Sequence, residues 1–222
     1  ILQVFFELGG RAQWAPNEKV ALEVGLGAAF GGGRALVTMK HVGLNVAADP
    51  LFTAAYTGVT GGLVVVSADD PGMASSQNEQ DNRHYAVAAG LPLLEPSDSQ
   101  EAYDLTLAAF ELSERWQLPV VLRMTTRVCH SKSVAVRRAP MAARAPRFER
   151  DIQGRVMIPA YARPAHRRLR RKLEAIQVFA ESTAALAVER RGDEALGIVT
   201  SGVTARHARE AAPEASLLEL KI

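Results

Sequence analysis

The stretch Ala35–Pro50, with the sequence ALVTMKHVGLNVAADP, decides how we expect this chain to fold. Its first five residues have the apolar character of a strand, and they run directly into a polar segment that contains Lys40, His41 and Asn45. Small residues follow, and a helix is expected to begin at Val46. A buried strand that ends in polar side chains just before a helix is typical of the ligand-binding edge of an open parallel sheet. We therefore expect these three side chains to point into one crevice.

The same alternation of strand and helix continues along the chain. Further strands are expected at residues 61–68, 91–95 and 119–124, and helices at 1–9, 16–30, 82–89 and 97–116. The helix after Asn45 is expected to be interrupted near Pro50. Residues 73–81 are polar without an apolar period and are predicted to form a loop. This pattern predicts an α/β fold, a parallel sheet with helices on both faces.

The composition changes after residue 130. Between Arg137 and Lys172 there are eleven arginines and one lysine against two acidic residues, with four prolines. We interpret residues 131–164 as a basic linker, followed by a basic helix over Ala165–Ala180. A second α/β unit is expected from a strand at 196–200, a helix at 204–211 and a strand at 216–220. The predicted division is 1–130 and 165–222 as two incomplete domains, with 131–164 between them.

Composition excludes several classes of protein. With 222 residues, 48% hydrophobic residues and a formal net charge of +2, the chain has the composition of a globular protein. The single cysteine, Cys129, excludes a disulfide framework and fits a reducing cytoplasm. No apolar run approaches the roughly 18 residues that a membrane span needs. The abrupt start at Ile1 and the strand-like end suggest an internal piece of a longer chain.

Two other patterns have alternative interpretations. The segment Gly25–Gly31 approaches a dinucleotide-binding fingerprint, but a helix is expected before it where the fingerprint needs a strand. Its small residues are better explained by close packing of that helix on the sheet. The arginine-rich stretch from Arg137 to Lys172 suits nucleic acid in charge, yet it lacks aromatic interleaving and any known motif. A solvated or interdomain surface is the favoured interpretation, and the scattered histidines indicate no metal site.

Three motifs occur in order along the first part of the chain. They are WAPNEKVALEV at Trp14–Val24, MKHVGLNVAADP at Met39–Pro50, and DDPG with SSQNEQD within Asp69–Asp81. Together they resemble the thiamine-diphosphate-dependent 2-oxoacid:ferredoxin oxidoreductases, and within that family the type that acts on arylpyruvates such as indolepyruvate. The resemblance extends from Trp14 to about Val128, and it continues more loosely through residues 159–167 and 196–202.

The resemblance implies a pyrimidine-binding domain for thiamine diphosphate. In this family a glutamate contacts the N1′ atom of the cofactor's aminopyrimidine ring and shares a proton with it. Glu18 matches that glutamate. Asn17, Lys40, His41 and Asn45 are expected to line the cofactor site beside it.

Substrate contacts are expected from the polar loop and the helix that follows it. The candidates are Gln77, Asn78 and Arg83, because amide groups and a guanidinium can bind a carboxylate and a carbonyl. Ala74 stands where the family usually has a histidine, which sets this loop apart from the family pattern.

The resemblance also implies the reaction and its partners. The family oxidatively decarboxylates a 2-oxoacid to an acyl-coenzyme A and reduces ferredoxin, with the cofactor ring serving as electron sink. Mg²⁺ and 4Fe–4S clusters are expected from segments outside these residues, and a smaller β subunit and ferredoxin are the expected protein partners. Alternatives are a different 2-oxoacid, such as pyruvate or 2-oxoglutarate, or a non-catalytic α/β module whose basic segment docks a partner.

Overall fold

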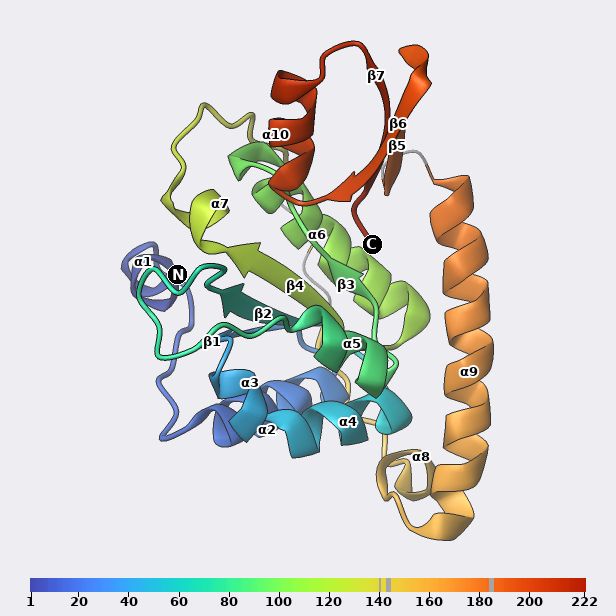
Figure 1. The fold of residues 1–222 in the computed structure, drawn as a ribbon. Coiled ribbons are helices and arrows are strands. Elements are labelled where there is room, and N and C mark those ends of the chain that lie inside the picture. Colours follow the sequence, from blue (N-terminus) through green and yellow to red (C-terminus); the bar gives the residue numbers. More distant parts are fainter. Residues whose placement is uncertain (140, 143–144, 184–185) are drawn as a thin grey trace.

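The computed structural model describes residues 1–139, 141–142, 145–183 and 186–222, and it contains two sheets (Figure 1). The larger sheet is parallel and has the strand order β1-β2-β4-β3. Its strands are β1 (Ala35–Lys40), β2 (Leu63–Asp69), β3 (Leu93–Leu94) and β4 (Val120–Thr125). The predicted parallel sheet is therefore confirmed.

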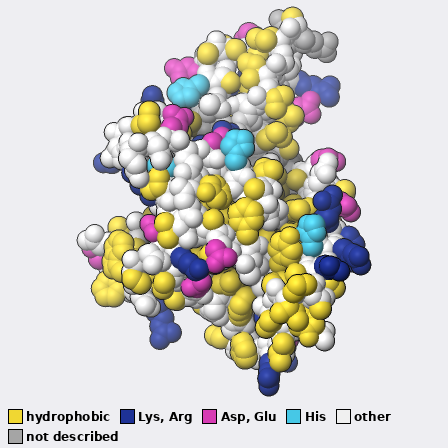
Figure 2. All heavy atoms as spheres, turned by 60° about the horizontal axis from the view of Figure 1, so that its bottom comes forward, with side chains coloured by type: hydrophobic (Ala, Val, Ile, Leu, Met, Phe, Trp, Pro, Cys, Tyr) yellow, Lys and Arg dark blue, Asp and Glu magenta, His cyan; other side chains and the backbone are white. Residues whose placement is uncertain are grey.

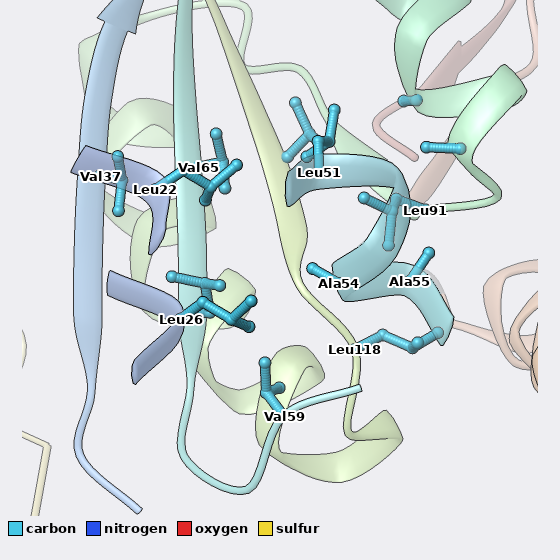
Figure 3. Packing of buried hydrophobic residues seen from close by; sticks show 14 of the residues in the cluster. Leu22, Leu26, Val37, Leu51, Ala54, Ala55, Val59, Val65, Leu91 and Leu118 are labelled. Carbon is cyan, nitrogen blue, oxygen red and sulfur yellow. The ribbon is translucent and has the colours of Figure 1, made fainter. Parts of the chain in front are cut away.

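Helices cover both faces of this sheet, as predicted. One face is covered by α2 (Glu18–Phe30), α3 (Gly43–Val46), α4 (Ala48–Thr57) and α5 (Arg83–Ala89), and the other by α6 (Ser99–Trp116). Because side chains alternate along a strand, Leu63 and Val65 of β2 face α2 and α4, whereas Val64 and Val66 face α6. Figure 3 shows the first of these layers, in which Leu22 of α2 lies close to Val65.

A glycine sets how closely α2 approaches the sheet. A Cβ atom built on Gly25 would lie 2.4 Å from Cγ2 of Val37 in β1, so no larger residue fits there without movement. The glycine-rich segment of this helix thus serves close helix–sheet packing, and the dinucleotide interpretation is not supported.

Several predicted boundaries are wrong, for local reasons. The helix after β1 begins at Gly43, three residues earlier than expected, and its break falls at Ala47. Pro50 does not interrupt α4, because it lies in the first helical turn, where a missing N–H costs nothing. Asn17 is the N-cap of α2, and Pro16 precedes the helix.

The basic helix is longer than predicted, and it packs on the side of the first sheet that α4 covers. It is α9 (Pro159–Ser182), which begins six residues before Ala165. Leu169 and Ile176 of this helix join the core cluster under α4. In Figure 1, α9 runs along the side of the molecule, next to α4 and α5. The remaining helices of this part are α1 (Leu2–Glu7), α7 (Thr126–His130) and α8 (Ile152–Arg155).

The second sheet contains a strand that the sequence did not reveal. Its order is β5-β7-β6, with β5 (Ala187–Arg190) antiparallel to β7 (Ala215–Leu220), and β6 (Asp193–Ser201) parallel to β7. The helix α10 (Thr204–Ala211) connects β6 to β7, as predicted. β5 was missed because its sequence, AVER, is short and half polar.

Buried ion pairs join the two sheets. The Lys221 ammonium group lies 2.5 Å from a carboxylate oxygen of Glu101 in α6 and 2.8 Å from one of Glu219 in β7. Arg206 of α10 also pairs with Asp98, the N-cap of α6. Within the residues described, no helix is both long and apolar enough to cross a membrane.

Candidate functional site

Polar side chains gather where the parallel strands end. Lys40 ends β1, Asp69 ends β2 and Thr125 ends β4, and the register of the strands brings these ends to one edge of the sheet. Residues 71–82, which we call the covering loop, extend from the end of β2 across this edge to the start of α5. The 40–45 segment and this loop therefore lie together at the edge where the sequence predicted a ligand crevice.

Glu18 lies at this edge and contacts the segment that follows β1. It is the first residue of α2, with the Asn17 side chain capping the helix by accepting a hydrogen bond from Val20 N at 2.9 Å. The Glu18 side chain is half-buried and lies against the backbone of Gly43: a Cβ on Gly43 would be 2.6 Å from its Cγ and 2.8 Å from its Oε1. The carboxylate therefore fills the space that any larger residue at position 43 would take.

The Glu18 carboxylate has no partner of its own. Among the described residues the structure gives it no hydrogen bond and no ion pair. The positive end of the α2 dipole favours a negative charge at this position. A half-buried carboxylate without a protein donor is able to accept a proton or a hydrogen bond from a ligand.

Several polar contacts join the 40–45 segment and the covering loop. Lys40 Nζ donates to Ser75 O at 2.8 Å, and the His41 ring lies 3.2 Å from the backbone oxygen of Asn78. Asn45 and Gln80 exchange two hydrogen bonds between their amide groups, at 3.0 and 2.9 Å. These contacts order both walls of the crevice.

His41 is fully buried and has one free nitrogen. Its Nε2 faces the backbone and side-chain oxygens of Asn78, which are acceptors, so this nitrogen carries the proton. Its Nδ1 is buried and has no partner among the described residues. His41 therefore supports the loop through Nε2, while Nδ1 has no partner among the described residues.

Asn45 and Arg83 are both occupied. The Asn45 side-chain oxygen also accepts a hydrogen bond from Tyr85 OH at 2.6 Å, so both of its acceptor positions are used by the protein. The Arg83 guanidinium binds Asp81 through three hydrogen bonds of 2.8–3.1 Å. Gln77 is exposed, with no hydrogen bond among the described residues. Of the predicted substrate contacts, only Asn78 lies against the 40–45 segment.

Asp70 organises the first turn of the covering loop. Its carboxylate accepts hydrogen bonds from Ser76 Oγ at 2.6 Å, Ser75 N at 2.7 Å and Thr126 Oγ1 at 2.8 Å. The hydroxyl of Ser76, then the amide of Ser75 and the hydroxyl of Thr126, hold the pKa of Asp70 well below its usual range. The charged carboxylate thus fixes the loop at neutral pH.

A buried ionic network under the loop was not foreseen from the sequence. Arg123 of β4 lies 2.7 Å from Asp69 and 2.5 Å from Glu95. Asn82, also buried, donates its side-chain amide to the carbonyl of His41 at 3.0 Å, and its backbone N–H donates to Asp69 at 3.1 Å. The available signal was an arginine within the otherwise apolar strand VVLRMT, since such a charge is buried only with a partner.

The arrangement fits a ring-shaped ligand with a polar edge. No group of histidine, cysteine and acidic residues in the described part of the chain could hold a metal ion. Glu18 supplies a free carboxylate, Gly43 supplies bare backbone, and Lys40 supplies an exposed cation whose only contact is a carbonyl. A heteroaromatic ring could lie along this backbone with a ring nitrogen toward Glu18.

Comparison with known families identifies this region. Residues 11–183 match the family described as "Pyruvate flavodoxin/ferredoxin oxidoreductase, thiamine diP-bdg". This range includes Glu18, the 40–45 segment, the covering loop and α9.

Curated relatives are similar over most of the chain. The indolepyruvate oxidoreductase subunit IorA of Methanothermobacter thermautotrophicus is 50% identical over 194 residues, which cover 86% of this chain and 31% of the relative. IorA of Archaeoglobus fulgidus is 46% identical over 201 residues, covering 90% and 32%. The ketoisovalerate oxidoreductase subunit VorB of M. thermautotrophicus is 29% identical over 125 residues, covering 53% and 36%. The chain spans about a third of the length of these relatives.

A solved structure shares the fold. The 2-oxoglutarate:ferredoxin oxidoreductase from Magnetococcus marinus superposes with a TM-score of 0.72 at 18% identity, covering 99% of this chain and 47% of that one. The similarity therefore includes both sheets.

Proposed function

Because this chain belongs to the thiamine-diphosphate-binding family of pyruvate flavodoxin/ferredoxin oxidoreductases, we propose that it forms the pyrimidine-binding part of a 2-oxoacid:ferredoxin oxidoreductase. The proposed protein is the large, α-type subunit of an indolepyruvate-type enzyme, which converts arylpyruvates to acyl-coenzyme A and passes electrons to ferredoxin. The observation that carries this proposal is the unpartnered Glu18 carboxylate held against Gly43 at the ligand edge of the sheet.

Glu18 has the proposed role of proton partner for the cofactor. Thiamine diphosphate, when bound, supplies an electron sink for decarboxylation of a 2-oxoacid. Glu18 would hold a proton between its carboxylate oxygen and the ring nitrogen N1′. The α2 N-terminus stabilises the negative form, and the half-buried position excludes part of the competing water.

The other predicted site residues are proposed to shape the crevice. Arg83 is paired with Asp81, whereas Lys40 has no carboxylate partner among the described residues. Lys40 is therefore the better candidate to contact an anionic group of cofactor or substrate. His41, Asn45 and Asn78 would act by ordering the covering loop. Asn17 would act through the cap that sets the position of Glu18, and Gln77 and Arg83 are secondary substrate candidates.

The arylpyruvate assignment is favoured by the relatives over other 2-oxoacids. Identity to the indolepyruvate enzymes is 50% and 46% over most of this chain, against 29% over about half of it for the ketoisovalerate enzyme. Pyruvate and 2-oxoglutarate remain the alternative substrates. The side-chain pocket that would distinguish them lies partly outside the present chain, which spans about a third of its relatives.

The rest of the catalytic apparatus is proposed to come from other segments. Mg²⁺ and 4Fe–4S clusters would bind elsewhere in the full-length protein, and a smaller β subunit, ferredoxin and coenzyme A would complete the system. Residues 1–130 would form the pyrimidine domain, 131–164 a linker and 165–222 the start of a second domain. A cytoplasmic location fits this chemistry.

The test is Glu18→Gln in the full-length enzyme, with Glu23→Gln as the matched control. Glu23 lies exposed on the same helix, so both changes replace an acid by an amide of equal size. Exchange of the cofactor's C2 proton, followed by NMR, should slow at least about a hundredfold in the Glu18 variant, as expected when a general acid–base group is lost. An unchanged exchange rate in that variant would refute the role proposed for Glu18.

A further inference from the structure

The outward side of α9 carries a group of arginines that the proposed site does not use. Arg163, Arg167, Arg170 and Arg171 are all exposed, and we call these four residues the basic ridge. With about 3.6 residues per turn, they lie on the side of the helix opposite the buried residues Ala165, Leu169 and Ile176. The ridge spans about 12 Å along the helix axis.

The ridge has no acidic partner within the protein. None of its four guanidinium groups forms an ion pair with any residue in the described part of the chain, and its one hydrogen bond runs from Arg171 Nε to the Arg167 carbonyl. Elsewhere the arginines that lie near acids are paired, as Arg34 is with Glu114 and Arg206 with Asp98. The cations of the ridge are therefore available to another molecule.

Positive charges also lie on the inner flank of α9. Lys172, on the inner flank of α9, donates to the Gln117 carbonyl at 3.2 Å. Its pKa is lowered, first by burial and then by repulsion from Arg168 and Arg155. Figure 2 shows Lys and Arg side chains gathered at one edge of the molecule, on the side where α9 runs in Figure 1.

The ridge is separate from the thiamine-type crevice. α9 packs against the part of the fold that precedes the strands: its Lys172 donates to the Gln117 carbonyl, just before β4. The preceding helix, α8, places Arg155 on the carbonyls of Thr57 and Gly58, before β2. The crevice lies where the same strands end. A partner on the ridge would leave the cofactor edge open.

We propose that the basic ridge of α9 is a docking surface for an acidic face of another protein. A row of carboxylates would pair with the four guanidinium groups, which bind carboxylates in a fixed, often two-pronged geometry. The inference does not rest on the proposed function, because the ridge and the crevice share no residue.

The composition of the helix favours a protein over nucleic acid. On the same side of α9, one and three turns beyond Arg170, the exposed acids Glu174 and Glu181 flank the exposed Val178. A phosphate backbone, negative throughout, would be repelled by these acids, whereas a protein surface can match the mixed pattern. A second copy of α9 fits less well, because four cations against two acids would leave the two ridges facing each other with excess positive charge.

The test compares two fourfold Arg→Gln variants of the full-length protein. The ridge variant changes Arg163, Arg167, Arg170 and Arg171. The control variant changes Arg11, Arg127, Arg137 and Arg150, which are likewise exposed and without an ion pair among the described residues. Both variants remove four positive charges, and glutamine has nearly the helix propensity of arginine. Circular dichroism checks the helix content of each.

The probe is a short poly-L-glutamate peptide, with duplex DNA and self-association measured in parallel. The ridge variant should bind the peptide at least about tenfold more weakly than wild type, with little change in the control, and the wild-type affinity should fall with salt. An equal loss of peptide affinity in both variants would show that only the net charge matters, and it would overturn the proposal. Tighter binding of duplex DNA, lost in the ridge variant, would assign the surface to nucleic acid. Loss of self-association in that variant would assign it to a second copy.

Discussion

The Glu18 carboxylate lies directly against the Cα atom of Gly43: a Cβ on Gly43 would lie 2.9 Å from the Glu18 carboxyl carbon. These residues are far apart in sequence and come from different elements, the first turn of α2 and the first turn of α3. The Glu18 carboxylate can take this position because Gly43 has no side chain. Glu18, expected at the site from the family resemblance, thus lies in contact with the 40–45 segment, expected there from the strand pattern.

Gly43→Ala should displace the Glu18 carboxylate and weaken thiamine diphosphate binding. We expect a loss of about ten- to a hundredfold in affinity, equivalent to one hydrogen bond to a charged group. Calorimetric titration of the full-length protein with the cofactor measures it. Gly27→Ala is the control, because a Cβ there meets nothing within 4 Å; equal affinity losses in the two variants would contradict the prediction.

Gly25→Ala should destabilise the fold by overpacking α2 against Val37. Alanine gains helix propensity over glycine, about 1 kcal/mol, and Gly27→Ala reports that gain alone. The clash at 2.4 Å should cost about 1–3 kcal/mol more. Urea unfolding measures both variants. Adding Val37→Ala to Gly25→Ala should recover part of the loss, and strictly additive free energies would argue against direct contact.

Asp70→Asn should alter the pH dependence of stability at acidic pH. The pKa of Asp70 in the folded protein is lowered from the ordinary 3.8 by hydrogen bonds from Ser76, Ser75 and Thr126. The stabilisation by the charged carboxylate is therefore complete above about pH 4 and is lost as the pH falls from there. The difference in unfolding free energy between wild type and variant should shrink over that range. A difference that stays constant with pH would contradict this account.

Arg123→Ala should be among the most destabilising substitutions in the first sheet. It would leave the carboxylates of Asp69 and Glu95 buried without their cation, at a cost of about 3–5 kcal/mol in unfolding free energy. Arg138→Ala breaks the exposed pair with Asp104 and should cost less than about 1 kcal/mol. If the two variants lose a comparable amount of unfolding free energy, the prediction that the buried network contributes more than an exposed pair is wrong.

The sequence predicted the first sheet well because its signals are local. The apolar strands and the glycine after α5 act within a few residues of where they occur. Some boundaries failed for local reasons, such as the place of Pro50 in the first turn of α4, and the boundary of α9 failed for a tertiary reason as well. α9 begins at Pro159 because Tyr161 and Ala162 already follow helical hydrogen bonding to Ile158, and its apolar stripe packs on a distant element.

The site was predicted in part, for a related reason. The spacing of Lys40, His41 and Asn45 after a strand pointed to the crevice, but spacing could not show which side chains are already occupied. Asn45 already bonds Gln80 and Tyr85, and Arg83 already bonds Asp81, through contacts across long sequence separations or around a tight turn. Arg123, Asp69 and Glu95 were overlooked because a buried network becomes visible only when three strands are side by side.

The matched contacts between the 40–45 segment and the covering loop bear on protein engineering. Each of these contacts needs one residue from each segment: Lys40 with Ser75, His41 with Asn78, and Asn45 with Gln80. A covering loop taken from a homologue to change substrate preference would lack the 40–45 segment with which it forms these hydrogen bonds. Chimeras of these enzymes should therefore exchange both segments as one cassette.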